Sequence, residues 1–125
     1  MRLLLDTHAF LWWASNSPEL DADARQSIAD QESFVAVSAA VAWEIATKRA
    51  LGKLKAPEDV VDQLRRHQFA PLPITIEHSV QAGALPLYHR DPFDRMLVAQ
   101  AQLEGLTIVT RDPNIPRYSV ATLPA

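Results

Sequence analysis

Four carboxylates lie far apart in the sequence, at positions where a folded chain could bring them together. Asp6 ends the apolar run RLLLD, and Asp112 comes two residues after the run TIVT. Glu44 and Asp94 lie near the starts of two segments with helical patterns. Carboxylate oxygens are hard ligands, which favour Mg²⁺ or Mn²⁺ over zinc. Such an ion supports hydrolysis of a phosphodiester by water, without a covalent intermediate.

Repulsion between these acids would make a counter-charge necessary if they do meet. Two carboxylates ~5 Å apart repel by roughly 3 kcal/mol at an effective dielectric constant of about 20. Summed over all pairs of four close acids, the repulsion is on the order of 10–20 kcal/mol, more than the stability of a typical domain. Protonation, nearby cationic side chains or a bound cation must relieve it.

Short apolar runs separated by helical patterns predict an α/β fold. Strands are expected at Arg2–Asp6, Phe34–Val37, Thr107–Thr110 and Tyr118–Thr122, and more weakly at Leu72–Thr75. Strands that read as continuous apolar runs are typical of a parallel sheet covered on both faces. We therefore expect an α/β/α sandwich with a four- to five-stranded, mainly parallel sheet.

The expected helices place the acids on one side of this sheet. They span Leu20–Asp30, Ser38–Gly52, Pro57–His67, Glu77–Leu85 and Asp91–Gly105, with Ser38 and Asp91 as N-caps. In an open parallel sheet the ligand crevice lies outside the carboxyl ends of the strands. All four acids are predicted to face that crevice.

Each acid also has a purely structural interpretation. Asp6 suits the N-cap of a helix that starts at Thr7. Glu44 has Lys48 four residues on, in the spacing of a helical ion pair, although Trp43 and Ile45 suggest that this helix is largely buried. Asp94 suits the first turn of a helix, and Asp112 suits a turn before a proline. Taken singly, these interpretations are as good as the catalytic one.

Composition limits the class of protein. The 125 residues are 48% hydrophobic and 22% charged, which predicts one folded domain spanning 1–125. The absence of cysteine excludes disulfides and thiolate metal sites. A net charge of −3 disfavours binding of nucleic acid by phosphate neutralisation alone. No apolar run is long enough to span a membrane and no signal peptide is recognisable, so a cytoplasmic protein is expected.

Four motifs together resemble those of PIN-domain ribonucleases, and most of all the VapC-type toxins of type II toxin–antitoxin pairs. They are MRLLLDTH, VSAAVAWEIATKRALGKL, YHRDPFDRMLVAQAQ and LTIVTRD, and they cover nearly the whole chain. The resemblance implies an endoribonuclease dependent on Mg²⁺ or Mn²⁺ that inhibits translation and growth. It also implies a homodimer and a cognate antitoxin that covers the cleft.

The resemblance assigns the catalytic and metal-binding roles residue by residue. Asp6 and Asp94 are expected to ligate the metal, and Glu44 to ligate it or orient water. Asp112 is expected to ligate it directly or through water, and the number of ions stays open.

Further residues near these acids are candidates for substrate contacts. They are Thr7, Ser38, Lys48, Arg95, Thr110 and Arg111, although helix capping, strand hydrogen bonds and solvated charge explain them equally well. Arg95 has a further alternative, an i,i+4 ion pair with Asp91. The four histidines show no metal-ligand spacing and are interpreted as surface or packing residues. His8 and His89 lie near the expected cleft.

Other functions fit the sequence less well. A phosphoacceptor receiver domain needs an acidic pair after its first strand and a late lysine, but Thr7 follows Asp6 and no lysine follows Lys55. A phosphatase with an aspartate nucleophile needs a second acid at position 8, where His8 stands. A housekeeping nuclease without an antitoxin and a non-enzymatic binding module remain as alternatives.

Overall fold

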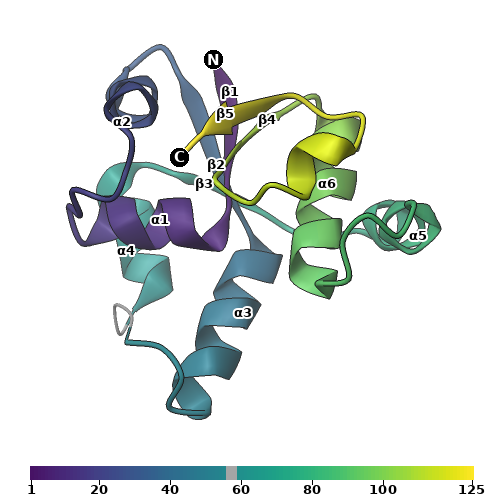
Figure 1. Ribbon diagram of the computed structural model, residues 1–125. Coiled ribbons are helices and arrows are strands. Elements are labelled where there is room, and N and C mark those ends of the chain that lie inside the picture. The colour runs from purple at the N-terminus through teal and green to yellow at the C-terminus, as the bar shows by residue number, and fades with distance from the viewer. Residues whose placement is uncertain (56–58) are drawn as a thin grey trace.

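The chain folds around a parallel sheet. The computed structural model describes residues 1–55 and 59–125 (Figure 1). Its five-stranded sheet has the order β3-β2-β1-β4-β5 and comprises β1 (Arg2–Leu5), β2 (Phe34–Ser38), β3 (Ala70–Leu72), β4 (Thr107–Thr110) and β5 (Thr122–Pro124). Every pairing is parallel, so all carboxyl ends lie along one edge. The predicted α/β sandwich with a parallel sheet is confirmed.

Helices cover the sheet from both sides. They are α1 (Thr7–Ala14), α2 (Ala22–Ala29), α3 (Ala39–Ala50), α4 (Val60–His67), α5 (Ile76–Ala84) and α6 (Pro92–Glu104), followed by the short 3-10 helix Ile115–Arg117. In Figure 1, α1, α2 and α4 lie on one side of the sheet, whereas α5 and α6 lie on the other and α3 extends beyond its carboxyl edge. No helix of the described residues is long and apolar enough to cross a membrane.

The central strand explains why the core forms. Leu3, Leu4 and Leu5 of β1 are fully buried, because helices cover both faces of the sheet and no side of the strand meets water. The neighbours β2 and β4 flank β1, and the first crossover leads from β1 to β2. The point where connections leave a central strand in opposite directions is where an open parallel sheet forms its crevice.

Two strand predictions need correction. Tyr118–Thr122 is not a strand: Tyr118 ends the 3-10 helix, and β5 begins only at Thr122. The weaker candidate at Leu72–Thr75 lies earlier, as β3. Both outermost strands contain a proline, Pro71 and Pro124. A sheet tolerates proline at its edge because no neighbouring strand needs the missing N–H.

Capping signals located the helices well. Ser38 and Asp91 accept N-terminal hydrogen bonds of α3 and α6, and Gly52 and Gly105 adopt positive φ angles of 69° and 67° beyond their ends. The helix predicted for Pro57–His67 is described from Val60, and Pro57 lies outside the described residues. The burial expected for Trp43 is wrong, since its side chain is 64% exposed.

Candidate active site

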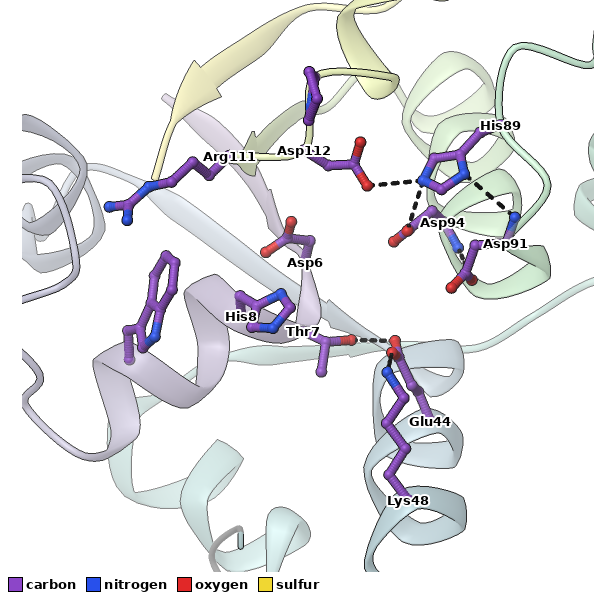
Figure 2. Close-up of a pocket in the computed structure, with 12 residues that line it drawn as sticks. Asp6, Thr7, His8, Glu44, Lys48, His89, Asp91, Asp94, Arg111 and Asp112 are labelled. Carbon is purple, nitrogen blue, oxygen red and sulfur yellow. Dashed lines mark hydrogen bonds and ion pairs between the residues drawn. The ribbon is translucent and has the colours of Figure 1, made fainter. Parts of the chain in front are cut away.

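A pocket of about 420 Å³ opens at the carboxyl edge of the sheet (Figure 2). The four acids chosen from sequence all line it, together with a fifth acid, Asp91. Among the described residues, the lining is Asp6, Thr7, His8, Trp12, Glu44, Lys48, His89, Asp91, Asp94, Arg111, Asp112 and Pro113. Residues from the two ends of the chain and from two internal helices therefore meet in one place.

Asp6 both caps a helix and lines the pocket. It is the N-cap of α1 and accepts a hydrogen bond from the Ala9 N–H at 2.9 Å. The residue is only 5% exposed, and burial raises the pKa of its carboxyl group above the usual value. Hydrogen bonds from the Thr110 hydroxyl and the Ala9 N–H oppose that rise. The capping interpretation is correct, and it does not remove Asp6 from the pocket.

Glu44 is buried between α1 and its own helix. Its Oε1 accepts a hydrogen bond from the Thr7 hydroxyl at 2.6 Å, and its Oε2 lies 2.5 Å from Lys48 Nζ (Figure 2). The hydrogen bond to Glu44 holds the pKa of Lys48 above its usual value. Glu44 thus has the predicted i,i+4 partner, but in a buried setting rather than on a solvated face.

The carboxyl group of Asp94 has a strongly raised pKa. It lies in the first turn of α6, where Asp91 caps the helix by accepting from the Phe93 and Asp94 N–H groups. Burial raises the pKa of Asp94 to about 7, and the charges of Asp91, Asp6 and Glu44 add to the rise. The neighbouring His89 opposes this rise. The negative charge around Asp94 therefore exceeds what the neighbouring side chains neutralise.

His89 joins two of the acids, which sequence reasoning missed. Its Nε2 lies 3.0 Å from Asp94 Oδ2 and 2.8 Å from Asp112 Oδ2 (Figure 2). Ligating atoms of these three residues all lie within 4.8 Å of one another. The interpretation of His89 as a surface or packing residue is therefore wrong. Its place in YHRDPFDR, five residues before Asp94, is the signal that could have identified it.

Asp112 is held by the loop that follows β4. Its backbone N–H donates to the Thr110 hydroxyl at 3.0 Å, and its Oδ1 accepts from the Asn114 N–H at 2.8 Å. The turn predicted for Asp112 is thus present and leaves Oδ2 directed at His89.

The candidate substrate residues divide into two groups. Thr7, Lys48 and Arg111 line the pocket. Ser38 and Thr110 lie beneath it, with hydroxyls that bond the Ala40 N–H and the Asp112 N–H. Both are buried, so their hydroxyls support the pocket and are not at its surface.

The prediction that Arg95 contacts substrate does not agree with its position. Its guanidinium donates to backbone carbonyls of the segment before α6, those of Ala82, Leu85, Pro86 and His89. The alternative of an ion pair with Asp91 is not what these contacts show either. Four carbonyls converge on one guanidinium because the segment folds back over the start of α6 and its C=O groups need donors.

Arg111 lines the pocket, but its guanidinium also makes contacts outside it. Its guanidinium is 4.4 Å from the centre of the Trp12 ring, and it donates to the carbonyl oxygens of Glu19 and Ala125. In Figure 2 its side chain points away from Asp112. Lys48 is therefore the better placed cation, since its Nζ lies 2.5 Å from Oε2 of the pocket acid Glu44, whereas the Arg111 guanidinium donates to carbonyl oxygens outside the pocket lining.

The chain matches the PIN domain family model over residues 3–121. The chain belongs to the PIN domain family. This PIN domain is 29% identical over 114 residues to Ribonuclease VapC22 of Mycobacterium tuberculosis, an alignment that covers 88% of this chain and 86% of that protein. The resemblance predicted from the four motifs is confirmed.

Solved structures share the fold at lower sequence identity. A chain of a toxin-antitoxin complex from Klebsiella pneumoniae matches with a TM-score of 0.69 and 18% identity, covering 98% of this chain and 96% of that one. A chain of VapBC2 from Rickettsia felis, bound to a DNA fragment from its promoter, matches with a TM-score of 0.68 and 15% identity, covering 98% of both. At such identities the matches show the fold of this PIN domain.

Proposed function

We propose that this PIN domain is a divalent-metal-dependent endoribonuclease and the toxin of a toxin–antitoxin pair. The observation that carries the proposal is the gathering of Asp6, Glu44, Asp94 and Asp112 in one pocket. Ribonuclease VapC22 is similar over most of both chains, which supports RNA as the substrate. A role in inhibiting translation and growth in the cytoplasm follows from that activity.

The donor set fits a hard divalent cation. The pKa values of Asp6 and Asp94 are raised, so the pocket holds acids whose charges the chain itself leaves poorly compensated. Oxygen donors of this kind suit Mg²⁺ or Mn²⁺, and the four acids would hold the ion. When bound, the cation lowers the pKa of a water molecule and neutralises charge on the scissile phosphate.

The chain's own side chains supply the remaining steps. Glu44 is held by Thr7 and Lys48, so its carboxylate is fixed where it orients the attacking water. Lys48 presents a partly exposed ammonium group at the same pocket and binds a backbone phosphate of the RNA. A local cation of this kind compensates for the net charge of −3, which would otherwise repel RNA.

The partner proteins follow from the relatives. Solved complexes that share the fold are toxin-antitoxin assemblies, which supports an antitoxin as partner. A homodimer as the toxin's own assembly is part of the same proposal. A cationic antitoxin side chain inserted among the acids would neutralise them as a metal does. Adding the cognate antitoxin should therefore suppress cleavage, and undiminished cleavage in its presence would contradict this partner.

The decisive experiment compares two aspartates that both cap helices. Asp6→Asn keeps an oxygen that caps α1 but removes a charge from the pocket, whereas Asp21→Asn makes the same change at the N-cap of α2. Each variant is incubated with tRNA, rRNA and mRNA in Mn²⁺, Mg²⁺ or chelator, and the product ends are mapped. We expect 5′-phosphate products from the parent and from Asp21→Asn only. Cleavage by Asp6→Asn at the parent rate would refute the site.

Expression in a growing host tests the toxin role. The parent chain should arrest growth, and the Asp6→Asn variant at equal abundance should not. Restoration of growth by a small gene that overlaps the upstream end of this one would identify the antitoxin. A housekeeping nuclease would instead be tolerated without a partner.

A further inference from the structure

The segment between α5 and α6 holds one imidazole in a fixed orientation. Nδ1 of His89 accepts a hydrogen bond from the Asp91 N–H at 3.3 Å, and Nε2 faces Asp94 and Asp112. A ring nitrogen that accepts a hydrogen bond carries no proton, so the ring's proton lies on Nε2. Nε2–H therefore donates to Asp112 Oδ2, on the loop after β4, and lies 3.0 Å from Asp94 Oδ2 of α6.

Two side chains that lie outside the pocket lining fix the backbone of this segment. The Tyr118 hydroxyl donates to the Pro86 carbonyl at 2.6 Å and accepts from the His89 N–H at 3.0 Å. Arg95 donates to the His89 carbonyl at 3.3 Å and to carbonyls of the preceding residues. The backbone of His89 is thus held at both its N–H and its C=O, and its side chain is 14% exposed.

We propose that His89 is a positioning residue that orients Asp112 for the metal by donating from Nε2–H and holds Asp94 by the attraction of the same N–H, and that it does not ligate the metal itself. The inference rests on the proposed function, because it assigns a role within that metal site. A ring with its proton on Nε2 offers no lone pair there, whereas each carboxylate keeps lone pairs beyond the one His89 uses. Partners that orient ligating groups in this way typically change metal affinity by about 10- to 100-fold.

The first experiment measures Mn²⁺ binding calorimetrically, apart from activity. His89→Ala removes the donor and should weaken Mn²⁺ binding by about 10- to 100-fold. His89→Gln offers an amide N–H in place of Nε2–H and should stay within about threefold of the parent. His67→Ala, which removes an imidazole from α4 outside the pocket lining, should bind Mn²⁺ like the parent. Equal affinities for His89→Ala and the parent, or equal losses in His89→Ala and His89→Gln, would overturn the role.

The second experiment distinguishes orientation from ligation. Pulsed electron paramagnetic resonance of the Mn²⁺-loaded parent should show no strong coupling to a directly bound imidazole nitrogen, and such a coupling would overturn the inference. Tyr118→Phe frees the His89 backbone without touching the pocket lining and should weaken Mn²⁺ binding by a smaller factor, about three- to tenfold. Unchanged affinity in Tyr118→Phe would contradict the part of the inference that concerns the backbone.

The two proposals fail in different ways. If the folded parent neither binds Mn²⁺ nor cleaves RNA, the proposed function is wrong and the role of His89 is wrong with it. If the parent does both and His89→Ala binds Mn²⁺ equally well, only the role of His89 is wrong. Thermal unfolding of each variant shows that the native state is populated during these measurements.

Discussion

Two histidines of this PIN domain contact carboxylates, but the regions around them differ in the number of negatively charged side chains. His78, on α5, is 2% exposed, accepts the Thr75 N–H at Nδ1 as half of a capping box, and lies 3.1 Å from Glu104 of α6. His89 has the same kind of backbone donor at Nδ1, but its Nε2 faces two carboxylates inside a pocket. One histidine with one half-exposed carboxylate stabilises a helix contact. One histidine among several carboxylates of one pocket leaves negative charge uncompensated, which is the condition that the proposed cation would relieve.

The largest expected difference between the regions is in catalysis. Asp94→Asn removes a pocket carboxylate and should lower RNA cleavage at least about 1,000-fold, because an amide neither holds a divalent ion nor compensates its charge as a carboxylate does. Glu104→Gln makes the matching change beside His78 and should cleave at the parent rate. Initial rates in Mn²⁺ at saturating RNA measure both. Equal losses in the two variants would mean that the regions do not differ in function.

The pH dependence of stability should differ between the same two variants. The folded-state pKa of Asp94 is about 7, above its usual 3.8, so the folded chain retains this proton more tightly than the unfolded chain. The stabilising effect is complete below about pH 4 and is lost as pH rises through 7, a change on the order of 3–4 kcal/mol. Urea unfolding in chelator at pH 5 and pH 8 should show the decline in the parent and in Glu104→Gln. A decline equally steep in Asp94→Asn would refute the assignment.

Substitution in the His78 region should affect stability and leave catalysis unchanged. His78→Ala removes half of the capping box and leaves a gap between α5 and α6, so we expect the free energy of unfolding to fall by roughly 2–3 kcal/mol. The rate of cleavage per folded molecule should match the parent. A fall in cleavage larger than the fall in folded protein would show that the two regions are coupled.

The smallest effect is expected from Glu104→Gln on stability. The Glu104 side chain is 42% exposed, and an ion pair in contact with solvent contributes less than about 1 kcal/mol. In chemical denaturation, the unfolding midpoint of Glu104→Gln should therefore lie close to that of the parent. A loss as large as that of His78→Ala would mean that the pair, rather than the capping box, stabilises this contact.

The sequence predicted that the four acids would share one pocket because one rule of sheet geometry connects them. Asp6 and Asp112 follow apolar runs that could only be buried strands, and the carboxyl ends of parallel strands share one edge. The two ends of α6 were equally predictable from the sequence. Asp91 is its N-cap, Pro92 its first residue and Gly105 its C-cap, and each of these signals acts within one turn of the helix end. Features that depend on neighbours in the sequence, or on a general rule of sheet topology, could therefore be predicted from the sequence.

The contacts of His89 and Arg95 could not be derived in this way, although the place of His89 in YHRDPFDR puts it near the cleft. Both depend on the conformation of the segment before α6, which Tyr118 fixes from 29 residues away. No periodicity or cap in the sequence encodes that contact. Trp43 was misjudged because a large apolar side chain on a helix is usually buried, whereas this one packs edge-on against Phe93 at the surface.

The position of β1 at the centre of the sheet has a consequence for how the acid cluster is held together. Asp6 follows β1 and Asp112 follows β4, and these two strands pair directly, so their pairing brings together acids that are far apart in the sequence. The cluster therefore exists only while β4 stays paired with β1. Local unfolding of β4 and β5 would carry Asp112 away from Asp6 and disperse the cluster.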